Sequence, residues 1–554
     1  MLNKIKRKLD RTWRMIPTDA YSDAGYSSWF TAQKKQSDRF VSGNAANFVD
    51  MPVFSIVVPL FDTPLSYLKD MSDSVLNQTY QNLELILVNA SPDKAELCVE
   101  LASLAAQDER VKIVTLLENL GITQNTYAGI AVAEGDFVCF LDHDDFLEPD
   151  ALFHYAQAIN ENQSIDLIYC DEDMIDEQGV FVRPLFKPNY SPDLLLSKNY
   201  VIHFLAIRKT LLDELEQPSS ELDGAQDYHL TLCAAESARA IHHVPKVLYH
   251  WRISPESTAV KAKAKPYAEE AGRKALELHL QRTGQAGEVS LGAIPNIYQT
   301  KLAVKEEPLV TILIETVNPK PCASFLSDLR DKLNYPKVEI IPVAGSLATR
   351  LQRLNQAVRE SAGEYLLFLN DSLKLPQDGF LTSLLALCQR EHAGAVAPIT
   401  LYSNNTIKHS GFALPPQGIL PLWHGVPDSY PGYLCQLTCL QNLSALPLTG
   451  MLLKRSAYNT AGGFNERFQS LVGDIEFCAR LTQAGYSLTQ VPSVKIILPE
   501  KCPEPRYTST LNPKDFNPTE IELFKQSNLK LWNSPDPYFN INLNQTSAYY
   551  QLPD

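Results

Sequence analysis

The sequence predicts two α/β domains in tandem, each a mostly parallel sheet flanked by helices. Short apolar runs rich in β-forming residues alternate with stretches of helical spacing from residue 53 onward. The same series of runs recurs later in the chain in the same order, at offsets of 228 to 256 residues. The chain has 554 residues, which is long enough for two or more domains.

In the first repeat, which we place at 51–287, the elements follow one another regularly. Apolar runs predict buried strands at 54–60, 83–88, 111–116, 136–141 and 166–170. Helical spacing of apolar residues predicts helices at 65–76 and 151–160. Strands that alternate with helices predict a doubly wound parallel sheet.

Acidic residues follow the strand at 136–141. The apolar run that begins at Gly135 stops at Asp142, Asp144 and Asp145. Ligands of open parallel sheets bind beyond the carboxyl ends of such strands. Crowded carboxylates repel one another unless a cation compensates, and hard divalent cations prefer carboxylate and phosphate oxygens. These residues predict a metal–diphosphate site; a solvated Asp-rich turn or helix cap is the alternative.

Further polar groups follow along the first repeat. The strand at 166–170 is expected to end at three acids, Asp171, Glu172 and Asp173, for which a helix-capping turn is an alternative. The stretches 223–229 and 247–252 then combine acids, histidines and an arginine. These residue types are the ones needed to deprotonate a nucleophile and to hold a leaving phosphate.

The second repeat differs where the chemistry is expected. We place it at 308–505, after a linker at 288–307 and before a C-terminal extension at 506–554. Its strand from Gly363 ends in Asn370-Asp-Ser-Leu-Lys374, with one acid, and Glu315 stands where the first repeat has Pro59. A metal site therefore belongs to the first repeat.

The N-terminal residues 1–50 are expected to form a basic amphipathic helix and a lead-in. Residues 1–16 contain six basic residues and one acid, and their apolar residues fall on one helical face at positions 2, 5, 9, 13 and 16. Such a helix can lie on anionic lipid, which would be a peripheral membrane contact. Alternatively, it docks its apolar face on its own domain.

The composition excludes several classes of protein. Hydrophobic residues make up 45% and charged residues 20%, which is typical of a globular protein. A net charge of −15 argues against a general nucleic-acid binder. The ten cysteines form no disulfide framework or zinc motif, and no apolar run reaches the ~18–20 residues of a membrane span. With no signal-peptide core, a cytoplasmic protein is expected, either free or peripheral at the inner face of the membrane.

Ten motifs of the first repeat together resemble glycosyltransferase family 2, and more closely its bacterial tandem enzymes of surface-polysaccharide and O-antigen assembly. The resemblance extends from about residue 40 to 536–540. Its motifs are Ser55–Pro59, Gln78–Tyr80, Asn119–Ile122, Leu141–Asp145, Asp171–Asp173, Lys187-Pro188, Ser191–Asp193, Asn199-Tyr200, Gly224–Asp227 and Leu248–Arg252.

This resemblance implies a GT-A fold and inverting transfer from a nucleotide diphosphate sugar, with Asp227 as the catalytic base. The residues expected to bind the donor are Pro59, Asp62, Asn89, Asn119, Asp142, His143 and Arg252. The residues expected to bind a divalent metal, Mn²⁺ or Mg²⁺, are Asp142, Asp144 and His250. The residues expected in a sugar or acceptor pocket are Asp171, Glu172, Asp173, Lys187 and Gln226.

The sequence also departs from the family. Asn89 stands where the family commonly has an aspartate that reads the nucleobase, and an amide donates as well as accepts. Gln226 replaces the acid that often precedes the catalytic aspartate. The second repeat keeps Asp474 and Glu476 but lacks the metal acids, so we favour a degenerate domain that binds acceptor or partner.

The expected function is transfer of a sugar, in the first domain and with a metal, to a glycan or lipid-linked glycan acceptor. The processive members' Gln-x-x-Arg-Trp motif is absent, which favours one or a few sugars per engagement. Two alternatives remain: an inactive glycan-binding or scaffold protein, and a bifunctional transferase with both domains active. A sugar nucleotidyltransferase would need a glycine-rich loop after its first strand, and residues 60–64 contain no glycine.

Overall fold

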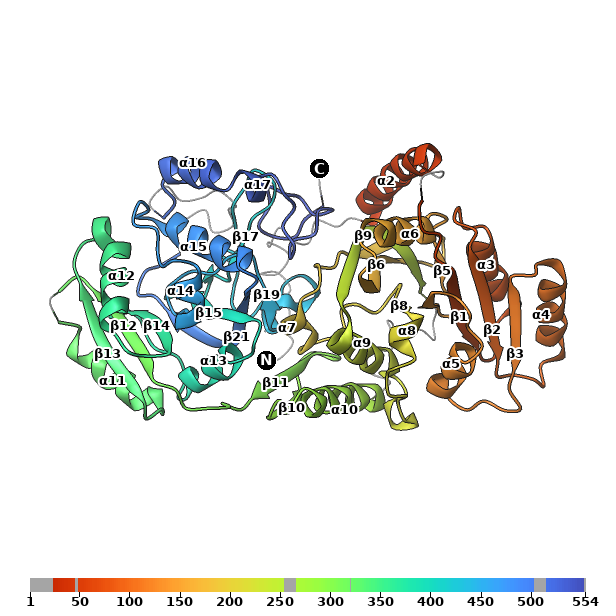
Figure 1. The fold of residues 1–554 in the computed structure, drawn as a ribbon, viewed down its shortest axis with the longest axis horizontal. Coiled ribbons are helices and arrows are strands. Elements are labelled where there is room, and N and C mark those ends of the chain that lie inside the picture. Colours follow the sequence, from red (N-terminus) through yellow and green to blue (C-terminus); the bar gives the residue numbers. More distant parts are fainter. Residues whose placement is uncertain (1–22, 45–47, 254–265, 319, 503–514, 553–554) are drawn as a thin grey trace, which may run out of the picture.

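The computed structural model describes residues 23–44, 48–253, 266–318, 320–502 and 515–552. It contains two α/β domains side by side, with the first domain on the right and the second on the left of Figure 1. The predicted fold class, two tandem domains with mixed, parallel-rich sheets, is confirmed. The basic helix expected at 1–16 lies outside the described residues. No helix within the described ranges is both long and apolar enough to cross a membrane.

The first domain is built on a nine-stranded sheet of order β3-β2-β1-β4-β8-β6-β9-β5, with β7 paired to β6. Its strands are β1 (Phe54–Leu60), β2 (Leu83–Asn89), β3 (Val111–Thr115), β4 (Phe137–Phe140), β5 (Phe146–Leu147), β6 (Ile165–Ile175), β7 (Phe181–Leu185), β8 (Ala206–Arg208) and β9 (Ala240–Arg252). Its helices are α2 (Asp23–Asn44), α3 (Leu65–Leu76), α4 (Ala95–Gln107), α5 (Ile122–Ile130), α6 (Ala151–Glu161), α7 (Pro192–Leu195), α8 (Lys209–Leu212), α9 (Gln226–Ser237) and α10 (Pro266–Arg282).

The strand and helix predictions for this domain are confirmed at β1 to β4, α3 and α6. Strands β3, β2, β1 and β4 pair in parallel, and all seven residues of both β1 and β2 are buried. Burial on both faces explains why these strands appear in the sequence as continuous apolar runs rather than as alternating ones.

Strand β6 is longer than predicted. The expected strand at 166–170 continues to Ile175, so Asp171, Glu172 and Asp173 lie inside the strand instead of beyond its end. The continuation pairs with β9 on one side and β7 on the other. Acids inside a buried strand require compensating partners, and these come from distant parts of the chain, as described below.

The second domain repeats the first with an eight-stranded sheet of order β13-β12-β14-β20-β15-β21-β19, with β16 paired to β15. Its strands are β12 (Val310–Thr316), β13 (Val338–Ala344), β14 (Tyr365–Asn370), β15 (Ala393–Leu401), β16 (Ile407–His409), β19 (Gln441–Asn442), β20 (Leu452–Lys454) and β21 (Ser487–Ile497), and β17 (Phe412–Ala413) pairs separately with β18 (Leu420–Pro421). Its helices are α11 (Ala323–Leu333), α12 (Arg350–Glu360), α13 (Phe380–Cys388), α14 (Arg455–Thr460) and α15 (Leu471–Gln483).

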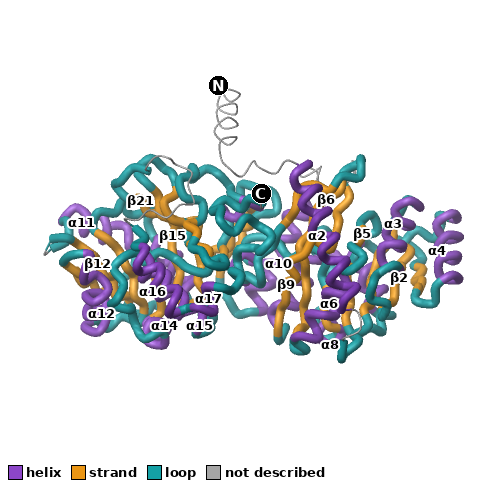
Figure 2. Tube along the Cα trace, turned by 90° about the horizontal axis from the view of Figure 1, so that it is seen from above, coloured by secondary structure: helices purple, strands orange, loops and turns teal. Residues whose placement is uncertain are grey.

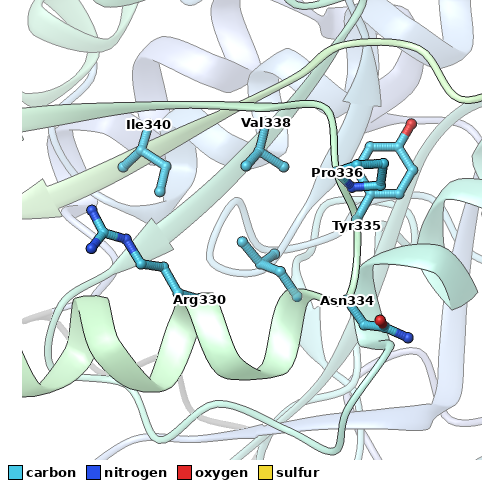
Figure 3. Close-up of a pocket in the computed structure, with 7 residues that line it drawn as sticks. Arg330, Asn334, Tyr335, Pro336, Val338 and Ile340 are labelled. Carbon is cyan, nitrogen blue, oxygen red and sulfur yellow. The ribbon is translucent and has the colours of Figure 1, made fainter.

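One edge of the second sheet differs from the first. Among the residues that the structure describes, no strand corresponds to β3, so β13 is an edge strand. A hollow of about 670 Å³ lies between this edge and α11, lined by Arg330, Leu333, Asn334, Tyr335, Pro336, Val338 and Ile340 (Figure 3). It contains no carboxylate, and Pro342 within β13 removes one backbone donor, as edge strands commonly do. The hollow therefore has no part in the predicted chemistry.

Two further segments join the domains. Within the predicted linker, β10 (Gly287–Leu291) and β11 (Tyr298–Leu302) form an antiparallel hairpin that packs on α10 and reaches α13. The C-terminal segment carries α16 (Pro518–Ser527) and α17 (Leu529–Trp532) on the second domain and then returns to the first. There the side chain of Asn540 donates hydrogen bonds to Asp171. Helix α2 lies over the first domain beside α6 and β6 in Figure 2.

Candidate active site

A cavity of about 720 Å³ opens at the carboxyl ends of β1 and β4, as expected for a parallel sheet. The amino-terminal ends of α5 and α9 form its sides, and α10 and the β10–β11 hairpin form a further wall. The polar residues that line it include Thr123, Thr126, Asp142, Asn199, His203, Asp223, Gln226, Asp227 and Asn296. Its volume is within the range of small-molecule sites.

A carboxylate–imidazole cluster lies beside this cavity. Ligand atoms of Asp142, Asp145 and His203 all lie within 4.8 Å of one another. The Asp145 carboxylate is fully buried and accepts hydrogen bonds from the Tyr249 hydroxyl and from the backbone N–H of Arg252, the latter at 2.8 Å. Burial and the neighbouring acids raise the pKa of Asp145 well above its usual value. A divalent cation would relieve this concentration of charge, and carboxylate and imidazole side chains are ligands of such cations.

His203 is a residue that the sequence reasoning missed. The ammonium of Lys187 donates to the His203 carbonyl oxygen, and the imidazole stacks on Tyr249 with 4.3 Å between ring centroids. Burial and the nearby Lys187 lower the pKa of His203 to about 3, which keeps the ring neutral, as a metal ligand must be. The motif Asn199-Tyr200 stands close by in sequence, but no sequence pattern marks His203 itself.

His250 was predicted to bind the metal, and the structure gives it a different role. Its Nδ1 lies 2.5 Å from Asp173 and its Nε2 lies 3.0 Å from Glu148, so both ring nitrogens face carboxylates. Neither nitrogen belongs to the Asp142–Asp145–His203 cluster. The reason is the continuation of β6, which brings Asp173 opposite His250 on β9.

The charge on His250 predicts a pH dependence of stability. Burial would lower the pKa of His250, but Asp173 and Glu148 raise it to about 9. Because the pKa is about 6.5 in the unfolded chain, the stabilisation is fully present below pH 6.5 and is lost as pH rises through 9. We expect chemical denaturation to show that the unfolding free energy falls over this range by up to about 3 kcal/mol more in the wild type than in His250→Gln. Equal slopes in the two proteins would contradict this role.

Asp227, the predicted base, lies in the first turn of α9 and lines the cavity. Its carboxylate accepts a hydrogen bond from the side-chain amide of Asn199 at 2.9 Å. Burial raises the pKa of Asp227 above its ordinary value, which moves a carboxylate toward the range useful for a general base. Asn199 is a second residue whose contribution the sequence reasoning did not assign.

Asp223 joins two walls of the cavity. Its carboxylate accepts hydrogen bonds from the hydroxyl and the backbone N–H of Thr123, in the first turn of α5. A negative charge at this position is favourable because helix amino termini carry unpaired N–H groups. Gly121, with φ +89°, precedes α5, and a Cβ there would lie 2.6 Å from the Asp223 carboxylate oxygen. The loop therefore requires glycine at this position.

The remaining predicted donor residues are distributed around the cavity and do not all line it. Pro59 and Asp142 line the cavity, together with Gln226 from the predicted sugar pocket. Four of the other five have local partners: Asp62 pairs with Lys94, Asn89 accepts from Ser91, Asn119 accepts from Gly121, and Arg252 donates to the Asp144 carbonyl and to Asp70. The fifth, His143, is half-buried. Their roles as donor ligands stay predictions.

The four other residues predicted for the sugar pocket form a buried network instead. Asp171 accepts from His243, at 2.9 Å, and from the C-terminal Asn540. Glu172 pairs with Lys187 at 3.0 Å, and Asp173 accepts from the hydroxyl of Tyr26 on α2. None of the three acids is exposed. Through Tyr26 and Asn540, this network ties α2 and the C-terminal segment to the first domain.

The second domain has an ion triad in the corresponding place. Arg350, the first residue of α12, donates to Glu315 on β12 at 2.7 Å and to Asp474 on α15 at 2.8 Å. Glu315 occupies the position of Pro59, and α12 and α15 correspond to α5 and α9 in the order of elements. Arg350 therefore bridges the strand and the helix between which the cavity lies in the first domain.

Comparisons with known proteins agree with this architecture. Residues 55–215 match the family described as Glycosyl transferase family 2. The uncharacterized protein y4gI of Sinorhizobium fredii is 32% identical over 525 residues, which cover 89% of this chain and 58% of the relative. The O-antigen biosynthesis protein RfbC of Myxococcus xanthus is 29% identical over 567 residues, which cover 97% of this chain and 44% of the relative. The chain thus spans about half the length of these relatives.

Among solved structures, residues 1–349 of TarS from S. aureus are 20% identical, with a TM-score of 0.32, over 41% of this chain and 65% of that chain. This likeness is too low to bear on the site. The family match falls on β1 to β8, the part of the first domain that supplies Asp142, Asp145 and His203. Residues 55–215 of the first domain thus carry the similarity to glycosyltransferase family 2.

Proposed function

We propose that the first domain transfers a sugar, with inversion, from a nucleotide diphosphate sugar to a glycan or lipid-linked glycan acceptor in bacterial surface-polysaccharide synthesis. The observation that supports the proposal is the cavity, because Asp142, His203 and the half-buried Asp227 all line it in the domain that contains the family match. The similarity to the Myxococcus relative, an O-antigen biosynthesis protein, favours this class of pathway.

Different residues at the cavity bind the metal and accept the proton. Asp142, Asp145 and His203 would hold a divalent cation, which when bound neutralises charge on the departing diphosphate. Asp227 accepts the proton of the attacking acceptor hydroxyl, and Asn199 holds the carboxylate in position for it. Attack from the face opposite the leaving group inverts the anomeric centre.

Donor screening tests the proposal directly. Thermal unfolding of the whole chain with Mn²⁺ and each of several nucleotide sugars should show a higher midpoint with the true donor, because a ligand that binds only the folded state stabilises it. Transfer is then measured with that donor and with oligosaccharide or lipid-linked acceptors. A protein that binds glycans but neither binds nor consumes any nucleotide sugar would be the inactive scaffold instead.

A further inference from the structure

The segment 191–199, which contains α7, connects the second domain to the cavity of the first. At its carboxyl end, Asn199 donates the hydrogen bond to Asp227. At its amino end, Asp193 is fully buried, although it lies in a short helix at the border of the two domains. The position of Asn199 therefore depends on what holds this segment.

The second domain surrounds Asp193 with donors. The side-chain amide of Asn442 on β19 donates to its carboxylate at 2.6 Å, and the hydroxyl of Thr489 on β21 and the guanidinium of Arg390 donate as well. Burial alone would raise the pKa of Asp193, but Arg390 and His392 hold it well below its usual range. The carboxylate therefore stays charged, and removal of one partner leaves a buried charge poorly compensated.

More contacts from the second domain follow along the segment. The Ser191 hydroxyl donates to the Asn442 side-chain oxygen at 2.8 Å. The Ser197 hydroxyl accepts from the backbone N–H of Leu440 at 2.9 Å, and the Lys198 ammonium donates to a second-domain carbonyl at 3.0 Å. Lys198 directly precedes Asn199, so the contacts with the second domain reach the immediate neighbour of Asn199.

The connecting hairpin supports the same segment from another side. The backbone N–H of Tyr298 donates to the Ser197 carbonyl at 2.7 Å, and the Thr300 hydroxyl donates to the Leu196 carbonyl at 2.6 Å. Tyr298 also lines the cavity. The segment is thus held between the second domain and β11.

We propose that the second domain is a positioning domain, which holds the segment 191–199 and through Asn199 fixes the carboxylate of Asp227. This inference rests on the proposed role of Asp227 as base. In the second domain, the Arg350–Glu315–Asp474 triad bridges the strand and the helix that correspond to walls of the first domain's cavity. Misplacement of a catalytic group by about 1 Å costs about 100-fold in rate.

The test uses variants of the second domain that lie outside the cavity. Asn442→Ala and Thr489→Val remove donors to Asp193. Glu315→Gln is the control, because it weakens a partly buried ion pair of the same domain without touching the segment. We expect the first two to lower kcat by about 10-fold to 100-fold with little change in KM for the donor, since Pro59 and Asp142 lie elsewhere. Glu315→Gln should retain kcat, and thermal unfolding reports the folding of each variant.

A double-mutant cycle separates positioning from general destabilisation. If the second domain acts through Asn199, Asn442→Ala should lower kcat much less in an Asn199→Ala background than in the wild type. Fully additive losses, or interface variants that keep kcat, would overturn the inference while transfer by the wild type stands. A wild type that transfers no sugar from any donor would overturn the proposed function, and this inference with it.

Discussion

Asp227→Asn is expected to lower kcat by about 10²-fold to 10⁴-fold, the usual contribution of a positioned general base. The amide has nearly the same shape and its oxygen can still accept the hydrogen bond that Asn199 donates at 2.9 Å, but it cannot take a proton from the acceptor. Steady-state transfer assays with the donor found by screening measure kcat and both KM values.

The same variant should bind donor normally. Asp227 belongs to α9, whereas the clustered residues Asp142, Asp145 and His203 follow β4 or precede β8. The groups expected to hold the donor's diphosphate are therefore separate from Asp227. Calorimetric titration with the nucleotide and Mn²⁺ should therefore give wild-type affinity. Wild-type turnover in Asp227→Asn would contradict the assignment of Asp227 as the general base. Loss of nucleotide affinity would show that Asp227 acts in donor binding.

A comparison of Asp142→Asn with Asp144→Asn tests the metal site. The family resemblance predicts Asp142 and Asp144 as ligands, whereas the structure groups Asp142 with Asp145 and His203. We expect Asp142→Asn to reduce Mn²⁺-dependent donor affinity by about 100-fold, because the site loses a charged ligand. Asp144→Asn should have a much smaller effect, since the contact of Asp144 with Arg252 is made by its backbone carbonyl.

The two variants are well matched, because they lie two residues apart in one loop and make the same chemical change. Titrations with and without Mn²⁺ isolate the metal-dependent part of the donor affinity. An equal loss in both variants would support the ligand pair expected from the resemblance. Unchanged affinity in Asp142→Asn would contradict both versions of the site.

Much of the first domain could be predicted because its elements are marked locally. The wholly buried β1 and the amphipathic α3 appear in the sequence as a continuous apolar run and as helical spacing. The cavity could also be anticipated, since the acids at 142–145 follow a strand and Asp227 belongs to a family motif. The repeat indicated that the second copy had lost these acids.

Other features depended on contacts between residues far apart in sequence. His203 and Asp142 come together only when β8 pairs with β4, and Asn199 reaches Asp227 across 28 positions. Asp171 finds its partner Asn540 after 369 positions. No local pattern specifies which of many acids a distant amide or imidazole will approach, so residues 171–173 were expected in a sugar pocket and proved to be a buried network.

The sequence by itself determined the tandem α/β architecture, the family of the first domain and the edge of the sheet where the acids gather. These depend on burial patterns and motifs that are contained within short stretches of chain. Only the tertiary structure decided that His203 joins the acids, that His250 pairs with Asp173, and that the second domain holds the segment behind Asn199. The physical reason is that a buried charge must be compensated by whichever groups the fold brings to it.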